Sequence, residues 1–213
     1  MASPATTTTA STRKKATDIT IYGATSFVAK HVITYLTQTA VSLEEPSSER
    51  STTVLKITLA GRNGTKLSDL EVLWEKRVNL LCQTMERATG RVVWDTHVAD
   101  GNDEKALQAM AARTKVVLNC AGPFALYSSS VVAACAKMGT DYVDITGEVS
   151  WVAAMREAHG PAAAKSGARI VSLCGYDSIP SDLSVLAAVQ ALREKKKSSK
   201  SKDKDVAIVK ATT

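Results

Sequence analysis

Aromatic residues, cysteines and long apolar runs are all scarce in this chain of 213 residues, of which 5% are aromatic. Its four cysteines, Cys82, Cys120, Cys135 and Cys174, lie far apart and form no C-x-x-C pair. Such spacing favours reduced, buried thiols in an intracellular protein over disulfides or a zinc site. No apolar stretch approaches the roughly 20 residues that a membrane-spanning helix needs. The N-terminus also lacks the hydrophobic region of a secretion signal.

Acidic residues are too few to balance the basic ones near the two ends of the chain. Residues 193–210 carry a net charge of +5, and Arg13, Lys14 and Lys15 against Asp18 add +2, so the rest is close to neutral. The overall charge of +6 therefore reflects the ends and not a basic binding face. With no aromatic residue among the lysines of residues 193–210, we expect no nucleic-acid partner.

Composition divides the chain into three segments. Residues 1–17, rich in Ser, Thr and Ala, predict a disordered N-terminal tail, with a mitochondrial presequence as the alternative interpretation. Residues 18–192 are long and apolar enough for one large domain. Residues 193–213 predict a basic linker, or simply a solvated basic tail. The apolar run Val206–Val209 in it is interpreted as the start of a second domain that the sequence does not contain.

The predicted domain is organised around a strand, a turn and a helix. Ile19 and Ile21 alternate with polar residues, Gly23 ends this strand, and apolar residues then recur at helical spacing as far as Gln38. A glycine turn that leads into a helix N-terminus presents free N–H groups to a pyrophosphate. The residues expected to hold this pyrophosphate are Gly23, Thr25, Ser26, Phe27, Val28 and Ala29.

The pattern of this turn is G-x-x-S-x-x-A rather than G-x-G-x-x-G. Ser26 keeps the middle position small and adds a hydroxyl donor, and Ala29 permits close packing of the helix on the strand. An ordinary turn between a strand and a helix is the alternative, because small residues are common at such turns.

The second predicted strand, Val54–Leu59, ends in a sequence that bears on cofactor choice. In a dinucleotide-binding fold the end of this strand faces the adenosine ribose, where an acidic residue accepts a hydrogen bond from the 2′-hydroxyl. Here the position holds Arg62, followed by Asn63, and no carboxylate. Since a guanidinium matches a 2′-phosphate, we expect NADP(H) rather than NAD as the cofactor.

Two later strand ends complete the predicted cofactor site. Asp100 follows the strand Arg91–Val98, where it either meets the adenine amino group or caps the next helix, a role that suits Asp103 at least as well. The strand Lys115–Cys120 is almost continuously apolar, as buried parallel strands are. It ends in a turn expected beside the nicotinamide ribose, with contacts from Asn119, Ala121, Gly122 and Pro123.

The remaining pattern predicts a doubly wound parallel sheet, an α/β Rossmann fold of about six strands with helices on both faces. Residues 38–53 read as an exposed insertion, and a helix over Trp151–Lys165 is expected to break at Gly160–Pro161. The other expected elements are helices over Leu67–Leu81, around Leu107 and over Ser128–Lys137, strands over Asp141–Ile145 and Ala168–Leu173, and a last helix that begins near Pro180.

The sequence does not identify catalytic residues. Tyr127 is followed four residues later by Val131, so the Tyr-x-x-x-Lys pair of short-chain dehydrogenases is absent. Tyr127, Glu148, Tyr176 and Asp177 lie near strand ends and could act as acid or base, but the sequence favours a capping or structural role for each of them. The three histidines lie apart from acids and cysteines, so no metal site and no Ser-His-Asp arrangement is expected.

Five motifs together resemble the N-terminal domain of the saccharopine dehydrogenase-like oxidoreductases. They are Tyr22–Ala29, Leu59–Asn63, Asn119–Phe124, Gly139–Glu148 and Gly175–Asp182, and the resemblance runs from about residue 18 to about residue 192. It implies a Rossmann domain that binds a nicotinamide cofactor, followed by a second α+β domain for substrate and dimer contacts. Bacterial relatives include trans-acting enoyl reductases of lipid biosynthesis, and animal relatives are associated with lipid droplets and membranes. Ser26 departs from relatives that have glycine there.

Three functions follow as hypotheses. The first is an NADP(H)-dependent oxidoreductase whose small-molecule substrate is a lipid-like or other hydrophobic carbonyl or enoyl compound, with little turnover by this segment alone. The second is a non-catalytic nucleotide-binding or scaffold protein, favoured by the missing acid–base pair. The third, saccharopine chemistry on a dicarboxylate, ranks last because the near-neutral domain lacks the basic residues that it needs.

Location and partners follow from the same resemblance. We expect an intracellular protein, cytoplasmic or associated with membranes or lipid droplets, with a mitochondrial location as the alternative. A homodimer and any lipid or membrane association would depend mainly on the part of the protein that the sequence does not contain.

Overall fold

A computed structural model describes residues 15–42, 54–84 and 91–198, and the structural statements that follow concern these residues. The chain divides into two units, Met1–Gly175 (unit 1) and Tyr176–Thr213 (unit 2). The predicted tail before residue 15, most of the predicted insertion and the end of the basic segment, with its apolar run, lie outside the described residues.

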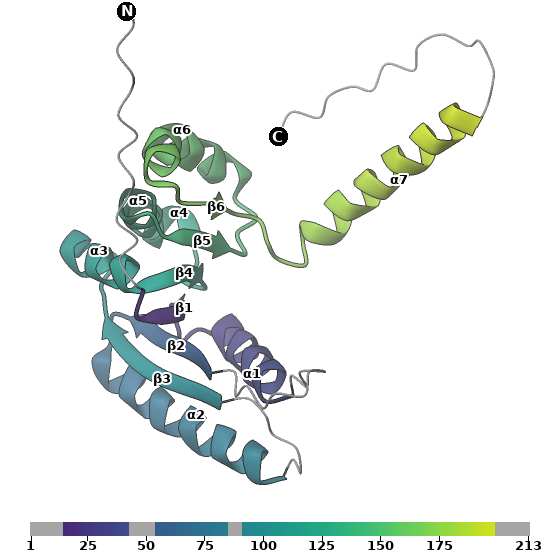
Figure 1. Cartoon of the computed structure of the whole chain (residues 1–213). Coiled ribbons are helices and arrows are strands. Elements are labelled where there is room, and N and C mark those ends of the chain that lie inside the picture. The colour runs from purple at the N-terminus through teal and green to yellow at the C-terminus, as the bar shows by residue number, and fades with distance from the viewer. Residues whose placement is uncertain (1–14, 43–53, 85–90, 199–213) are drawn as a thin grey trace, which may run out of the picture. The chain divides into compact units, whose positions relative to one another are not determined.

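Unit 1 is built on a six-stranded parallel sheet in the order β3-β2-β1-β4-β5-β6 (Figure 1). The strands are β1 Thr17–Tyr22, β2 Val54–Gly61, β3 Arg91–Val98, β4 Thr114–Asn119, β5 Asp141–Asp144 and β6 Ile170–Val171. Because β1 pairs with both β2 and β4, the strand order reverses beside β1. In open α/β sheets, ligands bind outside the carboxyl ends of the strands at this reversal. The predicted doubly wound α/β Rossmann fold is confirmed.

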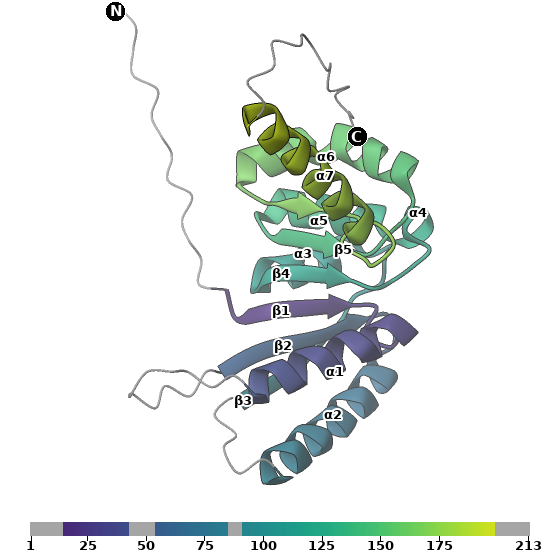
Figure 2. The same ribbon diagram turned by 90° about the vertical axis from the view of Figure 1, so that its right-hand side faces the viewer.

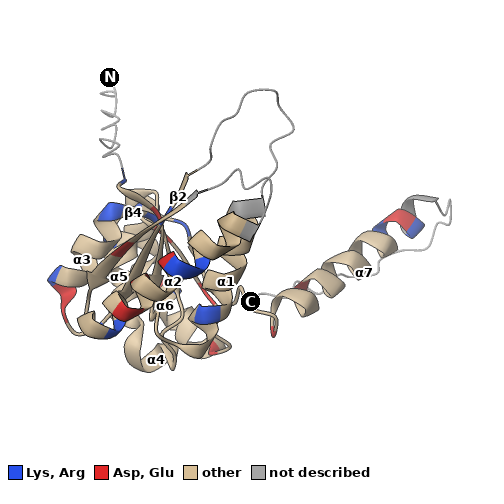
Figure 3. Cartoon of the chain, turned by 90° about the horizontal axis from the view of Figure 1, so that it is seen from below, with Lys and Arg blue, Asp and Glu red and all other residues tan. Residues whose placement is uncertain are grey.

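Helices cover both faces of the sheet, as the view along it shows (Figure 3). α1 (Phe27–Ser42) and α2 (Gly64–Thr84) lie on one face, and α3 (Glu104–Arg113) and α5 (Ser129–Met138) lie on the other (Figure 2). α6 (Val149–Ser166) packs against α5, and the single-turn helix α4 (Phe124–Tyr127) joins β4 to α5. Lys, Arg, Asp and Glu are interspersed over unit 1 in Figure 3, and no described helix is long and apolar enough to cross a membrane.

Neighbouring residues of β1 belong to different cores, one on each face of the sheet. Ile21 joins Ile33 and Leu59 in the core beneath α1 and α2. Tyr22 joins Val117 and other apolar residues in the core beneath α3 and α5. This arrangement explains the almost unbroken apolar strands of the sequence, since a sheet covered on both faces buries successive side chains alike.

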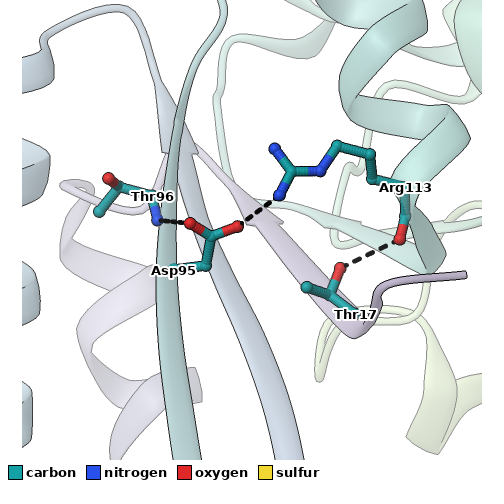
Figure 4. Close-up of polar contacts among 4 residues, drawn as sticks. All are labelled: Thr17, Asp95, Thr96 and Arg113. Atoms are coloured by element: carbon teal, nitrogen blue, oxygen red, sulfur yellow. Dashed lines mark hydrogen bonds and ion pairs between the residues drawn. The ribbon is translucent and has the colours of Figure 1, made fainter.

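Polar contacts tie α3 to β3 and to the amino end of β1. The Arg113 guanidinium at the end of α3 lies 2.9 Å from the Asp95 carboxylate of β3, and its carbonyl accepts a hydrogen bond from the Thr17 hydroxyl of β1 (Figure 4). At the same edge Asp18 pairs with Lys115 at 2.7 Å. The opposite edge, formed by the carboxyl ends of the strands, is left for the candidate site.

The structure differs from the prediction at the end of α1 and again after β4. α1 continues to Ser42, so residues 38–42 are helical and not part of an exposed insertion. Ala40, 6% exposed, packs in the core and extends the apolar face of the helix by another turn. After β4, the short helix α4 precedes the expected helix over Ser128–Lys137, and the sequence analysis did not predict it.

The prediction of a break in the helix after β5 is wrong. α6 runs without interruption from Val149 to Ser166 with Pro161 inside it. A proline ring normally clashes with the Cβ of the preceding residue when that residue is helical. Gly160 has no Cβ, so this clash is absent, and the exposed position of Pro161 leaves the helix free to continue.

The sixth strand is much shorter than the expected Ala168–Leu173, because β6 pairs only at Ile170 and Val171. The next two residues bind the Asp144 side chain instead of the backbone of β5. The Ser172 hydroxyl donates to Asp144 at 2.9 Å, and the Leu173 N–H donates to it at 3.2 Å. Leu173 then adopts a left-handed conformation with φ of 62°, which ends the strand.

Unit 2 contains α7 (Ile179–Ser198), which begins beside Pro180 as expected. The helix extends beyond Gln190 through residues assigned to the basic linker.

Candidate functional site

A cavity of about 400 Å³ opens at the carboxyl ends of β1, β2 and β4, beside the reversal of strand order. Seven of the residues predicted to bind a cofactor line it: Gly23, Thr25, Ser26, Arg62, Asp100, Ala121 and Gly122. The sequence places them at four separate strand ends, and the parallel sheet brings these ends to one edge. The other predicted residues, Phe27, Val28, Ala29, Asn63, Asn119 and Pro123, lie next to these in the chain but are not part of the lining.

Gly23 allows the turn after β1 to pass close to the turn after β4. Its φ is +73°, and a Cβ placed on it would lie 2.8 Å from both the Cβ and the backbone nitrogen of Ala121. No side chain fits in that space, and the backbone conformation itself favours glycine. The N–H groups of Gly23 and Ala24 both donate to the Ala60 carbonyl, which fixes the turn against β2.

The N-terminus of α1 follows this turn and is capped by Ser26. The Ser26 hydroxyl oxygen accepts a hydrogen bond from the Ala29 N–H at 3.2 Å, as a helix-capping serine does. The first N–H groups of a helix have no intrahelical acceptor, so those of Phe27 and Val28 remain available for an anion. The Ser26 hydroxyl thus accepts a hydrogen bond from the backbone, and it also has the hydrogen that the sequence analysis expected it to donate. Ala29 is fully buried, in line with the predicted close packing.

Arg62 is the exposed cation of the cavity wall, at the end of β2. Asn63 has a different role, because its side-chain oxygen accepts a hydrogen bond from the Lys66 N–H at 3.0 Å and so caps α2. The Arg62 guanidinium thus lies in the cavity wall next to the N-terminus of α2. The guanidinium is a full positive charge, and the helix N-terminus is a partial one.

Asp100 and Asp103 divide the two roles that the sequence left open. Asp103 caps α3 by accepting a hydrogen bond from the Ala106 N–H at 3.0 Å. Asp100 lines the cavity, and one of its oxygens accepts from the Asn102 N–H at 2.9 Å. Since its second oxygen has no partner among the described residues, Asp100 retains an acceptor for a ligand.

Asn119 supports the turn after β4 from behind, since it is fully buried. Its side-chain oxygen accepts from the Ala121 N–H at 2.9 Å, and its amide donates to the Ser128 hydroxyl at 2.7 Å and to the Tyr142 hydroxyl at 3.0 Å. The Gly122–Pro123 peptide bond that follows is cis. Asn119 therefore shapes the cavity wall without reaching its surface.

A buried carboxylate extends this support, and the sequence analysis did not assign it a role. Asp144 is 1% exposed and accepts hydrogen bonds from the Tyr142 hydroxyl at 2.9 Å, the Ser172 hydroxyl and the N–H groups of Thr146 and Leu173. The signal in the sequence is an aspartate that follows Tyr142 and Val143 at the end of a short strand, which requires partners once it is buried.

Glu148 caps α4 and so holds the far wall of the cavity. Its two carboxylate oxygens accept hydrogen bonds from the N–H groups of Phe124 and Ala125, at 2.8 and 3.0 Å. The end of α4 contributes Leu126 and Tyr127 to the lining. Of the four residues weighed as catalytic candidates, Glu148 is thus engaged in capping and Tyr127 faces the cavity. Tyr176 and Asp177 belong to unit 2.

Two further groups of the lining were missed by the sequence analysis and have shifted pKa values. Burial raises the pKa of the Cys120 thiol to about 11, so this side chain is protonated at neutral pH and is a weak nucleophile. Burial, followed by the charge of Asp100, raises the pKa of Tyr22, while Arg62 opposes the shift. Tyr22 directly precedes Gly23 and Cys120 directly precedes Ala121, so a position next to a predicted site residue is the signal that could have found both.

The donor set of the cavity fits a phosphorylated dinucleotide. Free N–H groups at the start of α1 suit a pyrophosphate, and Arg62 suits a further phosphate. The space that a Cβ on Gly23 would fill is kept open beside them. Among the described residues, no group of three His, Cys, Asp or Glu side chains is placed to hold a metal ion.

Comparison with known protein families gives one matching family model over most of unit 1. The family is described as the saccharopine dehydrogenase NADP binding domain, and the match covers residues 19–171. The matched segment includes every strand of the sheet except the first two residues of β1. All residues predicted for the cofactor lie within it.

Curated relatives and solved structures are similar to this chain. A trans-acting enoyl reductase of Mycobacterium leprae is 37% identical over 172 residues, which are 81% of this chain and 35% of the relative. A trans-acting enoyl reductase of Mycobacterium tuberculosis is 36% identical over 168 residues, with 79% and 34% covered. The chain thus spans about a third of the length of these relatives. A saccharopine dehydrogenase (L-Glu forming) from Saccharomyces cerevisiae shares the fold, with 18% identity, a TM-score of 0.56, and 84% of this chain and 32% of that chain covered.

Proposed function

The chain belongs to the saccharopine dehydrogenase NADP binding domain family, and from this premise we propose that it is the cofactor-binding part of an NADPH-dependent reductase. The proposed substrate is a hydrophobic, lipid-like compound with a carbon–carbon double bond conjugated to a carbonyl group. The names of the mycobacterial relatives support this choice, since they describe trans-acting enoyl reductases.

The observation that carries the proposal is the combination of donors around one cavity. The α1 N-terminus offers N–H groups to a pyrophosphate beside the Gly23 turn, and Arg62 offers a guanidinium where the second strand ends. No carboxylate follows β2 before Asp69, so nothing there repels a 2′-phosphate or prefers a free 2′-hydroxyl. This set of groups favours NADP(H) over NAD(H).

In the proposed reaction this part of the protein mainly binds and orients. When bound, a reduced nicotinamide supplies a hydride to the β-carbon, and a proton delivered to the α-carbon completes the saturated product. Ala121 and Gly122 present small surfaces at the end of β4, where the nicotinamide side of such a site lies, and Asn119 keeps their turn fixed. Tyr127 is the cavity-lining side chain best suited to hold a proton near a substrate.

A second function, a nucleotide-binding scaffold without catalysis, is favoured by one observation. The cavity lining contains no histidine and no lysine, and its thiol, Cys120, has a pKa of about 11. The two functions differ in turnover. A reductase that includes the remaining length of the relatives will consume NADPH with an unsaturated acyl substrate, whereas a scaffold will bind NADPH and leave it unchanged.

Calorimetric titration with NADPH and NADH, carried out on the wild type and on Arg62→Ala, tests the cofactor site. We expect the wild type to prefer NADPH, and the variant to lose roughly 10- to 100-fold in NADPH affinity, as loss of a charged hydrogen bond costs. Its NADH affinity should change little, because NADH lacks the 2′-phosphate.

Arg77→Ala is the matched control, because this arginine lies over the Trp74 ring on α2 and outside the cavity lining. Equal affinity of the wild type for NADPH and NADH, or equal loss of both in Arg62→Ala, would contradict the proposed role of Arg62. No binding of either cofactor by folded protein would overturn the proposed reductase function.

A homodimer, a lipid or membrane partner and an intracellular location belong to the same proposal. They concern the whole protein. About two thirds of the length of the relatives lies outside the part that matches this chain. Sedimentation and lipid-vesicle binding of a full-length protein would test the first two.

A further inference from the structure

We infer that the Tyr22 hydroxyl is a hydrogen-bond contact for the adenosine half of the nucleotide, an inference that rests on the proposed NADP(H) function. Tyr22 is the last residue of β1, directly before the glycine of the phosphate turn. Neither the composition nor the motif of this turn requires a hydroxyl at that position.

Tyr22 is buried as a residue, but its hydroxyl lies at the cavity and has no partner within the described protein. The residue is 5% exposed, and its ring packs in the core beneath α3 and α5. Buried tyrosine hydroxyls usually find a hydrogen-bond partner. Among the residues that the structure describes, the Tyr22 hydroxyl has none. Tyr142, in the same core, has two, namely Asn119 and Asp144.

The hydroxyl lies at the wall of the cavity and not in the closed core. A Cβ placed on Gly101, itself a lining residue, would lie 3.5 Å from the Tyr22 oxygen. Asp100 and Arg62, both of the lining, are near enough for their charges to act on the phenol in opposite directions. The unpartnered oxygen thus shares one cavity wall with the charged groups at the ends of β2 and β3.

These neighbours indicate which part of the ligand the hydroxyl meets. Arg62 is placed for a 2′-phosphate and Asp100 for the adenine amino group, and both belong to the adenosine half of NADP. The phenol is protonated at neutral pH, because burial and Asp100 raise its pKa. It therefore donates, and its acceptor is a ring nitrogen or a ribose or phosphate oxygen of that half.

A structural role explains the ring of Tyr22 but not its oxygen. Phenylalanine would fill the same core space, and it would remove only a polar atom at the cavity wall that has no partner among the described residues. If the oxygen serves only a ligand, its removal should leave the free protein as stable as before or slightly more stable. The same removal should weaken the nucleotide complex. A structural hydroxyl would show the opposite pattern.

The test is Tyr22→Phe, titrated with NADPH, with 2′,5′-ADP and with reduced nicotinamide mononucleotide. We expect the variant to bind NADPH and 2′,5′-ADP about 5- to 10-fold more weakly than the wild type, as loss of one neutral hydrogen bond predicts. Binding of the mononucleotide should not change, because it lacks the adenosine half. Tyr35→Phe is the matched control, since Tyr35 is 68% exposed on α1 and does not line the cavity.

Each other outcome has a distinct meaning. Wild-type affinity of Tyr22→Phe for 2′,5′-ADP overturns the inference and leaves the proposed function intact. Equal weakening of the mononucleotide also overturns it, because the contact would lie elsewhere. A free variant that unfolds at a lower urea concentration than Tyr35→Phe shows that the hydroxyl is structural and overturns it as well. Wild-type protein that binds none of the three ligands overturns the proposed function together with the inference.

Discussion

At the residue scale, two tyrosines of one core place their hydroxyls in opposite situations. Tyr22 ends β1 with an oxygen that has no partner among the described residues, whereas the Tyr142 oxygen lies between the Asn119 amide and the Asp144 carboxylate. Burial, followed by the charge of Asp144, strongly raises the pKa of Tyr142, so its hydroxyl is a permanent donor to that carboxylate. The same Tyr→Phe change therefore has different expected effects at the two positions.

Tyr142→Phe should destabilise the free protein by about 1–3 kcal/mol. The change removes one donor from the buried Asp144 carboxylate and one acceptor from the Asn119 amide, and unsatisfied buried groups cost about that much. Urea unfolding at pH 7 measures the difference, with Tyr22→Phe as the comparison within the same core. A Tyr142→Phe protein as stable as Tyr22→Phe would show that the network does not stabilise the fold.

The sequence predicts site residues well where a strand end itself marks them. Gly23, Arg62 and Ala121 line the cavity because parallel strands bring their carboxyl ends to one edge. It fails where a neighbour in the chain faces away from the cavity. Asn63 is such a case, since it turns to cap α2, and so is Asn119, which is buried behind its turn. Side-chain direction depends on tertiary contacts that spacing alone does not contain.

At the element scale, α6 shows how local sequence rules depend on neighbours. Proline inside a helix removes a hydrogen bond and usually ends or kinks the helix, which is why a break was predicted at Gly160–Pro161. The helix nevertheless continues to Ser166. A Cβ placed on Gly160 would meet nothing within 4 Å apart from its chain neighbours, so this glycine is not required by tertiary packing. Its importance lies in the proline that follows.

A double-mutant cycle at these positions tests this explanation. Pro161→Ala should stabilise the protein by about 2–3 kcal/mol, since an interior proline costs about 3 kcal/mol and its stiffening of the unfolded chain returns up to about 1 kcal/mol. In that background Gly160→Ala should add roughly 0.5–1 kcal/mol. In the wild type the same Gly160→Ala change should destabilise, because the new Cβ meets the proline ring. Urea unfolding of the four proteins measures the coupling, and an equal gain from Gly160→Ala in both backgrounds would contradict the explanation.

The strands and helices were otherwise predictable in order and type, and the exceptions have a common cause. β6 is short because Asp144 takes the hydrogen bonds of Ser172 and Leu173, a contact between residues 28 and 29 positions apart. α4 forms where Glu148, 23 and 24 positions away, caps its first turn. Periodicity within a window of sequence contains no information about such partners.

At the scale of the whole of unit 1, the two edges of the sheet have different tasks. The carboxyl edge holds the cavity, and the amino edge holds ion pairs that include Asp18 with Lys115 and Asp141 with Arg169. The hydrogen bond and charge of Arg169 lower the pKa of Asp141. For Asp18, burial acts to raise the pKa, but hydrogen bonds from Lys115 and the Lys56 N–H outweigh it, so its pKa is lowered as well. The fold is thus stabilised by carboxylates remote from the ligand.

This separation predicts how acid affects the free protein. A carboxyl group whose pKa is lower in the folded than in the unfolded chain, where it is about 3.9, stabilises the fold fully above that value. The contribution is lost as the pH falls through the folded pKa. These groups should therefore change the unfolding free energy little between pH 7 and about pH 5. At pH values under about 4 the unfolding free energy should decrease. Asp141→Asn should be less stable than the wild type at pH 7 and should lose less stability below pH 4.

Asp69→Asn is the matched control for this acid titration, because Asp69 is exposed on α2 and has no partner among the described residues. It should keep the wild-type dependence on pH, measured by urea unfolding from pH 7 to pH 3. The Asp141→Asn protein should retain wild-type affinity for NADPH at pH 7, since the amino edge lies across the sheet from the cavity. If Asp141→Asn followed the wild-type curve at every pH, its ion pair with Arg169 would not contribute to stability. If the variant lost NADPH affinity while folded, the two edges would be coupled, and the division of tasks between them would be wrong.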